Sequence, residues 1–364
     1  MADITQAQVE KAIQEYIDPY MDQDLVKAKA IKNIVIDGGK VTVDVDLGFP
    51  AKGYEQELAE QLTTRIKAID GVDDVTVNIS WEIIAHAVQA GVNPIPGVKN
   101  IIAVASGKGG VGKSTTSVNL ALALSAEGAN VGILDADIYG PSQPRMLGTS
   151  AKPETDEANK SLQPVISYNL QSMSIGYLID EETPMIWRGP MVTQALEQLL
   201  RETAWKDLDY LIIDLPPGTG DTQLTLAQKV PVSGSIIVTT PQDIALLDAR
   251  KALKMFEKVE IPVLGVIENM STHICSQCGH EEHIFGAGGG NAMAEQYDVD
   301  FLGALPLDIR IREETDAGKP TVVAEPEHKI SQTYRDIARR VAAKLARRKK
   351  DYSSKFPNIV IQNS

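Results

Sequence analysis

Residues 107–115 read Gly-Lys-Gly-Gly-Val-Gly-Lys-Ser-Thr, and this stretch constrains the fold more than any other part of the chain. It satisfies the pattern G-x-x-x-x-G-K-[ST], with an apolar, strand-like run before it and a helical pattern from Ser114 after it. Glycines let successive backbone N–H groups point into one cavity, and the start of a helix adds positive potential there. The sequence therefore predicts a phosphate-binding loop for a nucleotide. The residues assigned to this loop are Gly107, Lys108, Gly109, Gly110, Val111, Gly112, Lys113, Ser114 and Thr115.

Several residues in and around this loop have predicted chemical roles. Lys113 is expected to reach the β- and γ-phosphates, and the Ser114 hydroxyl is expected to ligate Mg²⁺. Asp214 ends an apolar run, as expected of an acid that holds the Mg²⁺ shell. Asp137 follows a second apolar run, and we favour it over Asp135 as the acid that orients the attacking water.

The order of apolar runs predicts an α/β fold in two domains. In 99–350, uniformly apolar runs of strand length alternate with helical patterns, which indicates a P-loop NTPase domain with a mostly parallel sheet covered by helices on both faces. Residues 1–90 predict a small α+β domain of helix (9–17), two strands, helix and strand. Residues 91–98 contain two prolines and two glycines and form the predicted linker, and 351–364 form a C-terminal tail.

Composition excludes several classes of function. The chain has 49 Asp and Glu against 35 Lys and Arg, a formal charge of −14, and such a surface repels nucleic-acid backbones. The apolar runs are too short to span a membrane, and the N-terminus lacks the basic and apolar parts of a signal peptide. We therefore predict no nucleic-acid partner and no membrane. Two cysteines do not make a disulfide framework, so the cytoplasm is the expected compartment.

Both cysteines, Cys275 and Cys278, lie in one C-x-x-C motif. Two thiolates do not complete a zinc or iron–sulfur site, which generally takes about four protein ligands. Two copies of the motif that meet across the axis of a homodimer would supply four thiolates and hold one [4Fe–4S] cluster. The flanking His273, His280 and His283 allow another interpretation, a Cys/His zinc site within one chain. The residues alone support cluster and zinc about equally, and a redox dithiol or a buried thiol pair less well.

The loop contains a lysine in addition to Lys113, and this residue, Lys108, gives the chain its first family resemblance. Residues 108–113 resemble the deviant Walker A motif of the MinD, ParA and nitrogenase iron protein class. This resemblance implies an ATPase that dimerises with ATP and in which Lys108 reaches the nucleotide of the partner chain. An ammonium group brought against phosphates across an interface would compensate their charge.

A wider set of motifs resembles the Mrp/ApbC family of iron–sulfur cluster carrier ATPases. The match spans about 99–320 and includes the loop, the C-x-x-C motif, Asp135 to Ser142, Trp187 to Met191, Asp214 to Asp221 and Glu268 to Ser271. The resemblance implies that the chain binds ATP and Mg²⁺ and holds a [4Fe–4S] cluster in a homodimer. It also implies apo iron–sulfur proteins and cluster-assembly scaffolds as partners. By the same resemblance, Asn269 recognises adenine, and Pro306 and Asp308 line the base pocket.

Residues 1–90 resemble the MIP18-like module that is often fused to this family. The similar positions are Asp18-Pro19 and Asp46-Leu47-Gly48. The reactive cysteine frequent in that module is absent from 1–90. We therefore expect this domain to bind a partner rather than a cluster.

Two rival functions use the same kind of nucleotide site. A ParA-type partitioning ATPase would bind DNA, and its only support is the basic stretch from Tyr334 to Lys350. A MinD-type positioning ATPase would bind a membrane, but the tail 351–364 contains Pro357 and lacks a basic amphipathic pattern. In both cases the C-x-x-C motif would be a zinc site. Because no second catalytic constellation is found, we predict slow ATP hydrolysis that alters the dimer's hold on its cluster.

Overall fold

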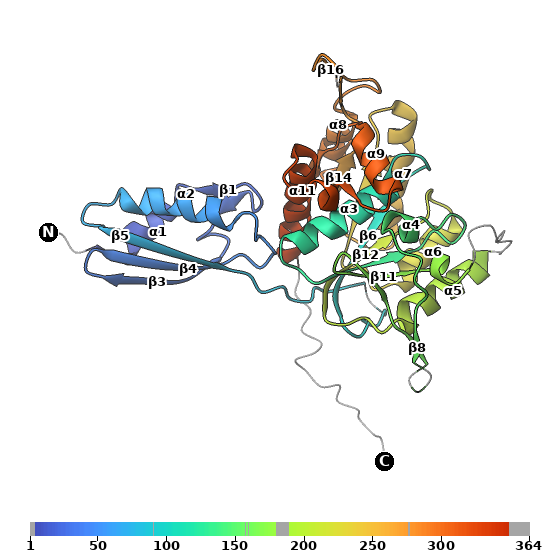
Figure 1. The fold of residues 1–364 in the computed structure, drawn as a ribbon. Coiled ribbons are helices and arrows are strands. Elements are labelled where there is room, and N and C mark those ends of the chain that lie inside the picture. The colour runs from blue at the N-terminus through green and yellow to red at the C-terminus, as the bar shows by residue number, and fades with distance from the viewer. Residues whose placement is uncertain are drawn as a thin grey trace.

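The computed structural model describes residues 4–89, 91–156, 158, 160–179, 189–275 and 277–348. The predicted tail (351–364) and Trp187 with Arg188 of the family resemblance lie outside the described residues. The chain forms a small N-terminal unit and a larger unit built around an eight-stranded sheet (Figure 1). Among the described helices, none combines the length and the apolar character that a bilayer crossing requires.

The small unit has the predicted order of helix, two strands, helix and strand, with an additional pair of two-residue strands after the first helix. Its elements are α1 (Gln6–Gln14), β1 (Ile17–Asp18), β2 (Gln23–Asp24), β3 (Ile31–Asp37), β4 (Lys40–Asp46), α2 (Glu55–Lys67) and β5 (Asp74–Ser80). Strand β4 pairs antiparallel with β3 and parallel with β5. The first helix is shorter than the predicted 9–17. It ends at Gln14, and the Asp18 carboxylate accepts hydrogen bonds from the N–H groups of Tyr20 and Met21, which forms a turn instead.

The large unit contains the predicted sheet, with strand order β10-β11-β7-β12-β6-β13-β14-β17. These strands are β6 (Val98–Ala105), β7 (Val131–Asp135), β10 (Val165–Ser167), β11 (Leu170–Ser174), β12 (Leu208–Asp214), β13 (Gly234–Thr239), β14 (Val263–Glu268) and β17 (Phe301–Ala304). All neighbours pair in parallel except β10, which runs antiparallel to β11 at one edge. The prediction of a mostly parallel sheet is confirmed.

Helices cover both faces of this sheet, as predicted. They are α3 (Lys113–Ala126), α4 (Gln143–Met146), α5 (Gly189–Glu202), α6 (Asp221–Lys229), α7 (Asp243–Lys258), α8 (Gly289–Gln296), α9 (Ile309–Asp316), α10 (Thr321–Ala324) and α11 (Lys329–Ala346). Short two-residue strands are β8 (Thr155–Asp156), β9 (Ser161–Leu162), β15 (His273–Ile274) and β16 (Glu281–Glu282). Along β6, Ile102 and Val104 join the core with α3 and α11, whereas Ile101 and Ala103 join the core with α5 and α7. Burial on both faces explains the unbroken apolar runs.

The carboxyl ends of the central strands meet at one edge of the sheet. Strand β6 leads into the glycine-rich loop, β7 ends at Asp135, β12 ends at Asp214 and β14 ends at Glu268. Strand β12 lies between β7 and β6, and its register sets Asp214 opposite Asp135. Ligands of open α/β sheets bind outside the carboxyl ends of the strands. The topology therefore brings the loop and both acidic strand ends to one site.

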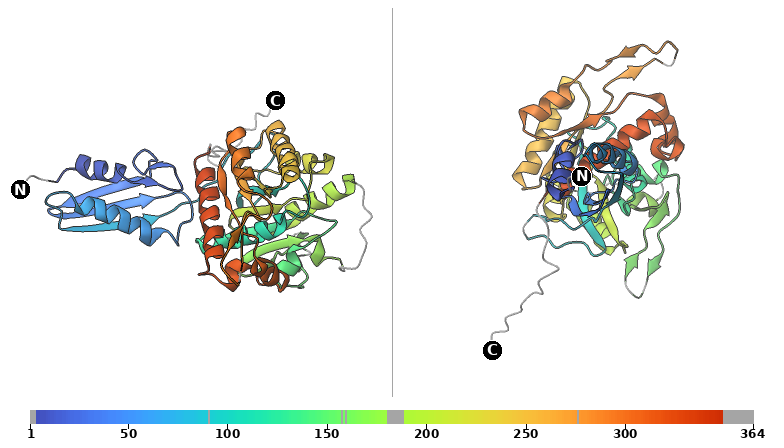
Figure 2. Two further views of the ribbon diagram at one scale, coloured as in Figure 1. Left: turned by 90° about the horizontal axis from the view of Figure 1, so that it is seen from above. Right: turned by 90° about the vertical axis from the view of Figure 1, so that its left-hand side faces the viewer.

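A buried ionic contact joins the small unit to the large one. Glu127, fully buried at the C-terminal end of α3, accepts hydrogen bonds from the Gly53 N–H at 2.9 Å and from the Arg335 guanidinium at 2.6 Å. The guanidinium of Arg339, one helical turn along α11, lies 5.0 Å from the centre of the Tyr20 ring. Figures 1 and 2 both show α11 on the side of the large unit that faces the small one. The two units are thus held together through α3 and α11.

We expect Glu127→Ala to lower the free energy of unfolding by about 3 kcal/mol, because it leaves the largely buried Arg335 without its carboxylate partner and the Gly53 N–H without its acceptor. Urea unfolding measures the change. The matched control is Glu202→Ala at the exposed end of α5, where the expected change is below about 0.5 kcal/mol. Equal unfolding midpoints for the two variants would contradict a structural role of this contact.

Candidate functional site

The loop between β6 and α3 uses backbone conformations that glycine adopts readily. Gly110 has a φ of 81° and Gly112 has a φ of 79°. Gly107 lies against the backbone of Asp248 on α7, where any Cβ atom would clash. Helix α3 begins at Lys113, so the positive end of a 14-residue helix faces the loop. This arrangement is suited to phosphate groups.

Two residues with predicted roles at the phosphates and at Mg²⁺ form an ion pair. Lys113 Nζ lies 2.5 Å from Asp214 Oδ1 and 3.1 Å from Ser114 Oγ. The fully buried Asp214 also accepts hydrogen bonds from Ser117 Oγ at 2.9 Å and from Gln143 Nε2 at 3.0 Å. These donors stabilise a carboxylate removed from water. If Lys113 bound a phosphate instead of Asp214, the Asp214 carboxylate would keep its hydrogen bonds from Ser117 and Gln143.

Asp135 and Asp137 have different surroundings. Asp135 is fully buried, and its carboxylate accepts hydrogen bonds from the N–H groups of Asp137, Ser142 and Gln143 at 2.9–3.1 Å. Burial, together with the nearby charge of Asp214, raises the pKa of Asp135 to about 7. Asp137 is only half-buried, and burial raises its pKa as well. Asp135 therefore organises the loop after β7, and Asp137 remains the acid available to a ligand.

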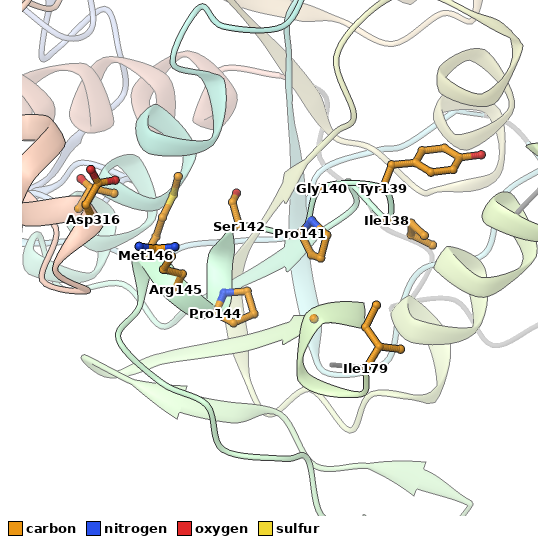
Figure 3. Close-up of a pocket in the computed structure, with 12 residues that line it drawn as sticks. Ile138, Tyr139, Gly140, Pro141, Ser142, Pro144, Arg145, Met146, Ile179 and Asp316 are labelled. Carbon is orange, nitrogen blue, oxygen red and sulfur yellow. The ribbon is translucent and has the colours of Figure 1, made fainter. Parts of the chain in front are cut away.

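A cavity of about 290 Å³ lies over the glycine-rich loop. Its lining consists of Ser106, Lys108, Gly109, Gly110, Gly112, Lys113, Ser114, Thr115, Asp137, Gly140, Ser142, Met146 and Pro217. Lys108 is half-buried among these residues. Gly140, Ser142 and Met146 also line a neighbouring cavity of about 550 Å³, along the segment that follows β7 (Figure 3). The structure thus gathers the predicted loop residues and Asp137 around one space.

The residues predicted for the base pocket do not line this cavity. Asn269 Nδ2 donates a hydrogen bond to Val111 O at 2.9 Å, so the side chain braces the loop. Asp308 caps α9 through the N–H of Arg310 and also binds its guanidinium, which lowers the pKa of Asp308. Pro306 lies in the segment between β17 and α9. Adenine recognition by these residues stays a prediction.

The C-x-x-C motif lies in the turn between β15 and β16. The N–H groups of Gln277 and Cys278 donate to the Cys275 sulfur, and with the Cys278 thiol they lower the pKa of Cys275. Cys275 is half-buried, Cys278 is exposed, and both thiols are free. Figure 1 shows this hairpin projecting from the large unit. A stabilised and accessible thiolate is suited to metal binding.

The flanking histidines do not complete a metal site with these cysteines. Within the part of the chain that the structure describes, no three His, Cys, Asp or Glu side chains gather closely enough to hold a metal ion. His273 Nδ1 lies 3.0 Å from Leu307 O, and His283 Nδ1 lies 3.0 Å from Ser271 O, so both rings are bonded to the backbone. In the described structure His273 and His283 thus contact the backbone rather than Cys275 and Cys278.

Ser117, Gln143 and Ser174 are buried polar residues of the site that sequence reasoning missed. Ser117 lies one turn after Lys113 on α3 and donates to Asp214. Gln143 follows directly after the stretch from Asp135 to Ser142 that carries part of the family resemblance. Ser174 lies at the end of β11, and its Oγ donates a hydrogen bond to the Asp135 carboxylate at 3.1 Å. Helical spacing was an available signal for Ser117. Only the strand order reveals Ser174.

Family models and curated relatives match most of the chain. The model described as NUBPL iron-transfer P-loop NTPase matches residues 97–342, and that of an iron-sulfur cluster assembly protein matches residues 6–79. The iron-sulfur cluster carrier protein of Haemophilus influenzae is 51% identical over 345 residues, covering 93% of this chain and 92% of the relative. The iron-sulfur cluster carrier protein of Escherichia coli K12 is 50% identical over 339 residues, covering 93% of this chain and 92% of the relative. The iron-sulfur cluster transfer protein NUBPL of Mus musculus is 50% identical over 254 residues, covering 69% of this chain and 79% of the relative.

Solved structures resemble the large unit. A nucleotide-binding protein from Archaeoglobus fulgidus in complex with ADP is 37% identical, with a TM-score of 0.56 and coverage of 64% of this chain and 90% of that one. The cell division ATPase MinD of Pyrococcus furiosus has a TM-score of 0.50 at 22% identity and covers 66% of this chain and 98% of its own. At that identity the MinD likeness concerns the fold alone. The prediction of a P-loop NTPase fold is confirmed.

Proposed function

Because this chain belongs to the family of NUBPL iron-transfer P-loop NTPases, we propose that it carries an iron–sulfur cluster to apo iron–sulfur proteins under the control of bound ATP. The observation that carries the proposal is the combination of a phosphate-binding loop with an accessible C-x-x-C hairpin in one chain. Cluster-assembly scaffolds would supply the cluster. Thiols that must stay reduced suit the cytoplasm.

The cargo would be a [4Fe–4S] cluster shared by two chains. Cys275 and Cys278 supply two thiolates, and no third ligand gathers with them among the described residues. A cluster generally takes about four protein ligands, so a two-fold homodimer is the simplest assembly that provides them. A cluster held half by each chain is released when the halves separate. Such a site suits a carrier better than a permanent redox centre.

The nucleotide site fits ATP with Mg²⁺. Ser114 Oγ and Asp214 Oδ1 both lie within 3.1 Å of Lys113 Nζ, so a hydroxyl and a carboxylate oxygen converge where the lysine now sits. Hydroxyl and carboxylate oxygens are the ligands that Mg²⁺ prefers. Ser114 would ligate the cation and Asp214 would hold its shell. When bound, Mg²⁺ would neutralise charge on the phosphate oxygens.

Hydrolysis would depend on few groups of this chain. Lys113 would leave Asp214 for the phosphates, and Asp137 would orient the attacking water from the loop after β7. Lys108 would act on the nucleotide of the partner chain across the dimer. Among the described residues that line the cavity, only Lys108, Lys113 and Asp137 carry charged side chains. We therefore propose that turnover is slow and changes the geometry of the dimer rather than a second substrate.

A short segment links the glycine-rich loop to the cluster hairpin and supports control by nucleotide. Asn269 bonds Val111 O in the loop, and Cys275 follows six residues later. Between them, both the N–H and the Oγ of Ser271 bond Leu305 O at 3.0 Å, which anchors the segment. A shift of the loop on phosphate binding would act on Asn269 and, through the six residues that follow, on the start of the hairpin. This linkage is the proposed coupling between ATP and the cluster.

The basic helix α11 argues against the DNA-binding alternative. Arg335 bonds the buried Glu127, and Lys344 lies 2.7 Å from Asp22 and 2.8 Å from Asp300. These contacts occupy charges that a DNA backbone would need. The MinD likeness rests on fold, and the tail 351–364 lies outside the described residues. We propose that the N-terminal domain (1–90), joined by the linker 91–98 to the ATPase domain (99–350), recognises a protein partner.

Anaerobic reconstitution with iron and sulfide tests the proposal. We expect a brown protein that absorbs near 400 nm and contains about four irons per two chains. Size-exclusion chromatography of the loaded protein should give a dimer. A colourless protein that instead retains about one zinc per chain would contradict the carrier function and favour the Cys/His site.

A further inference from the structure

Two consecutive residues beside the nucleotide site have buried polar atoms with no hydrogen-bond partner. They are Ser142, through Oγ, and Gln143, through Oε1. Ser142 also lines the cavity over the glycine-rich loop and is visible in Figure 3. Buried polar atoms are normally paired, so each of these two atoms calls for a partner that the chain itself does not supply.

The neighbours of Gln143 fix which way its amide points. Nε2 lies 3.0 Å from Asp214 Oδ2 and 3.2 Å from Ser114 O, and both of these atoms are acceptors only. The flipped amide would set Oε1 against the Asp214 carboxylate and lose both hydrogen bonds. The backbone N–H of Gln143 is held by Asp135 at 3.0 Å, and the side chain is fully buried. Oε1 is therefore a fixed acceptor without a donor.

The waters of a hydrated divalent cation would supply such a donor. Mg²⁺ bound through few protein ligands keeps several of its waters, and these waters donate hydrogen bonds to nearby acceptors. Gln143 Nε2 bonds the carboxylate of Asp214, the proposed shell residue. It also bonds the backbone carbonyl of Ser114, whose hydroxyl is the proposed ligand. We propose that Gln143 is a positioning residue of the Mg²⁺–nucleotide site, fixing Asp214 through Nε2 and accepting from a cation-bound water through Oε1. This inference rests on the proposed ATP binding.

The test is the Mg²⁺ dependence of nucleotide affinity, measured with a fluorescent ATP analogue in Mg²⁺ and in EDTA. We expect Gln143→Met, which keeps the length but removes donor and acceptor, to reduce the tightening by Mg²⁺ by about ten-fold or more. Gln143→Asn keeps the amide donor and acceptor on a shorter side chain and should retain more of the tightening than Gln143→Met. The matched control, Gln171→Met on β11, should behave as wild type, because its amide bonds Lys206 O away from the loop.

Three outcomes decide the inference. Wild-type tightening by Mg²⁺ in a folded Gln143→Met variant would overturn it. Equal loss in folded Gln143→Met and Gln143→Asn would also overturn it, because the amide group would then not matter. If Gln143→Met does not fold, Gln143→Leu replaces it, and wild-type tightening by Mg²⁺ in the folded Gln143→Leu variant overturns the inference. Wild-type protein that does not bind the analogue at all would instead contradict the proposed ATP function.

Discussion

Cys275→Ala and Cys278→Ala are each expected to remove nearly all iron from the reconstituted protein. One substitution per chain removes two of the four thiolates from a shared site, so the remaining ligands cannot hold a cubane cluster. The hairpin itself should persist, because its strands pair through the backbone of β15 and β16. Iron and sulfide analysis after anaerobic loading, with the absorbance near 400 nm, measures the effect.

The matched control for this experiment is His280→Ala. His280 is exposed and has Glu282 as a neighbour at 3.7 Å, and it is one of the three histidines from which the zinc alternative would draw its ligands. We expect this variant to load iron like the wild type. Loss of metal in His280→Ala as severe as in Cys275→Ala would contradict the shared thiolate site.

Lys113→Ala is expected to weaken ATP binding by about 100-fold or more, because the phosphates lose their one buried cationic donor in the loop. The same change leaves the buried Asp214 without its cation, so the free energy of unfolding should fall by about 3 kcal/mol. Iron loading should remain, since the cysteines lie in a separate hairpin. Titration with a fluorescent ATP analogue measures binding, and thiol labelling of Cys275 and Cys278 with and without ATP measures the coupling.

Lys99→Ala provides the comparison for Lys113→Ala. Lys99 pairs with Asp209 at 2.8 Å near the start of β6, at the far end of the strand from the loop. The Lys99→Ala variant should bind ATP as the wild type does, and ATP should still alter the labelling of Cys275 and Cys278 in it. If Lys113→Ala delivers cluster to an apoprotein as well as Lys99→Ala does, ATP is not coupled to transfer.

Much of the nucleotide site was predictable from sequence because its parts are local. The loop 107–115 carries its glycines, lysine and hydroxyl in one stretch, and only a strand before it and a helix after it are needed to aim them. Asp137 and Asp214 were predictable because acids at the carboxyl ends of parallel strands reach the same edge of a sheet. Cys275 and Cys278 were identified because both thiols belong to one local C-x-x-C motif.

Contacts between distant segments were not predictable in this way. The sequence contains no sign that Gln143 spans Ser114 and Asp214, or that Lys113 pairs with Asp214. The contact of Asn269 with Val111 O was not predictable either, because it depends on β14 ending beside the loop. Each of these contacts depends on which strands are neighbours, and many strand orders are compatible with the same apolar runs.

The amino-acid sequence by itself determined the chemistry that each segment offers: a loop for phosphate, acids at strand ends and a pair of thiols. The tertiary structure alone decided which groups meet. It set Asp214 against Lys113, anchored the helix α3 to the small unit through Glu127, and left no third ligand near the thiols in the described chain. The physical reason is that local motifs follow from neighbouring residues, whereas the pairing of buried polar groups follows from strand order and packing.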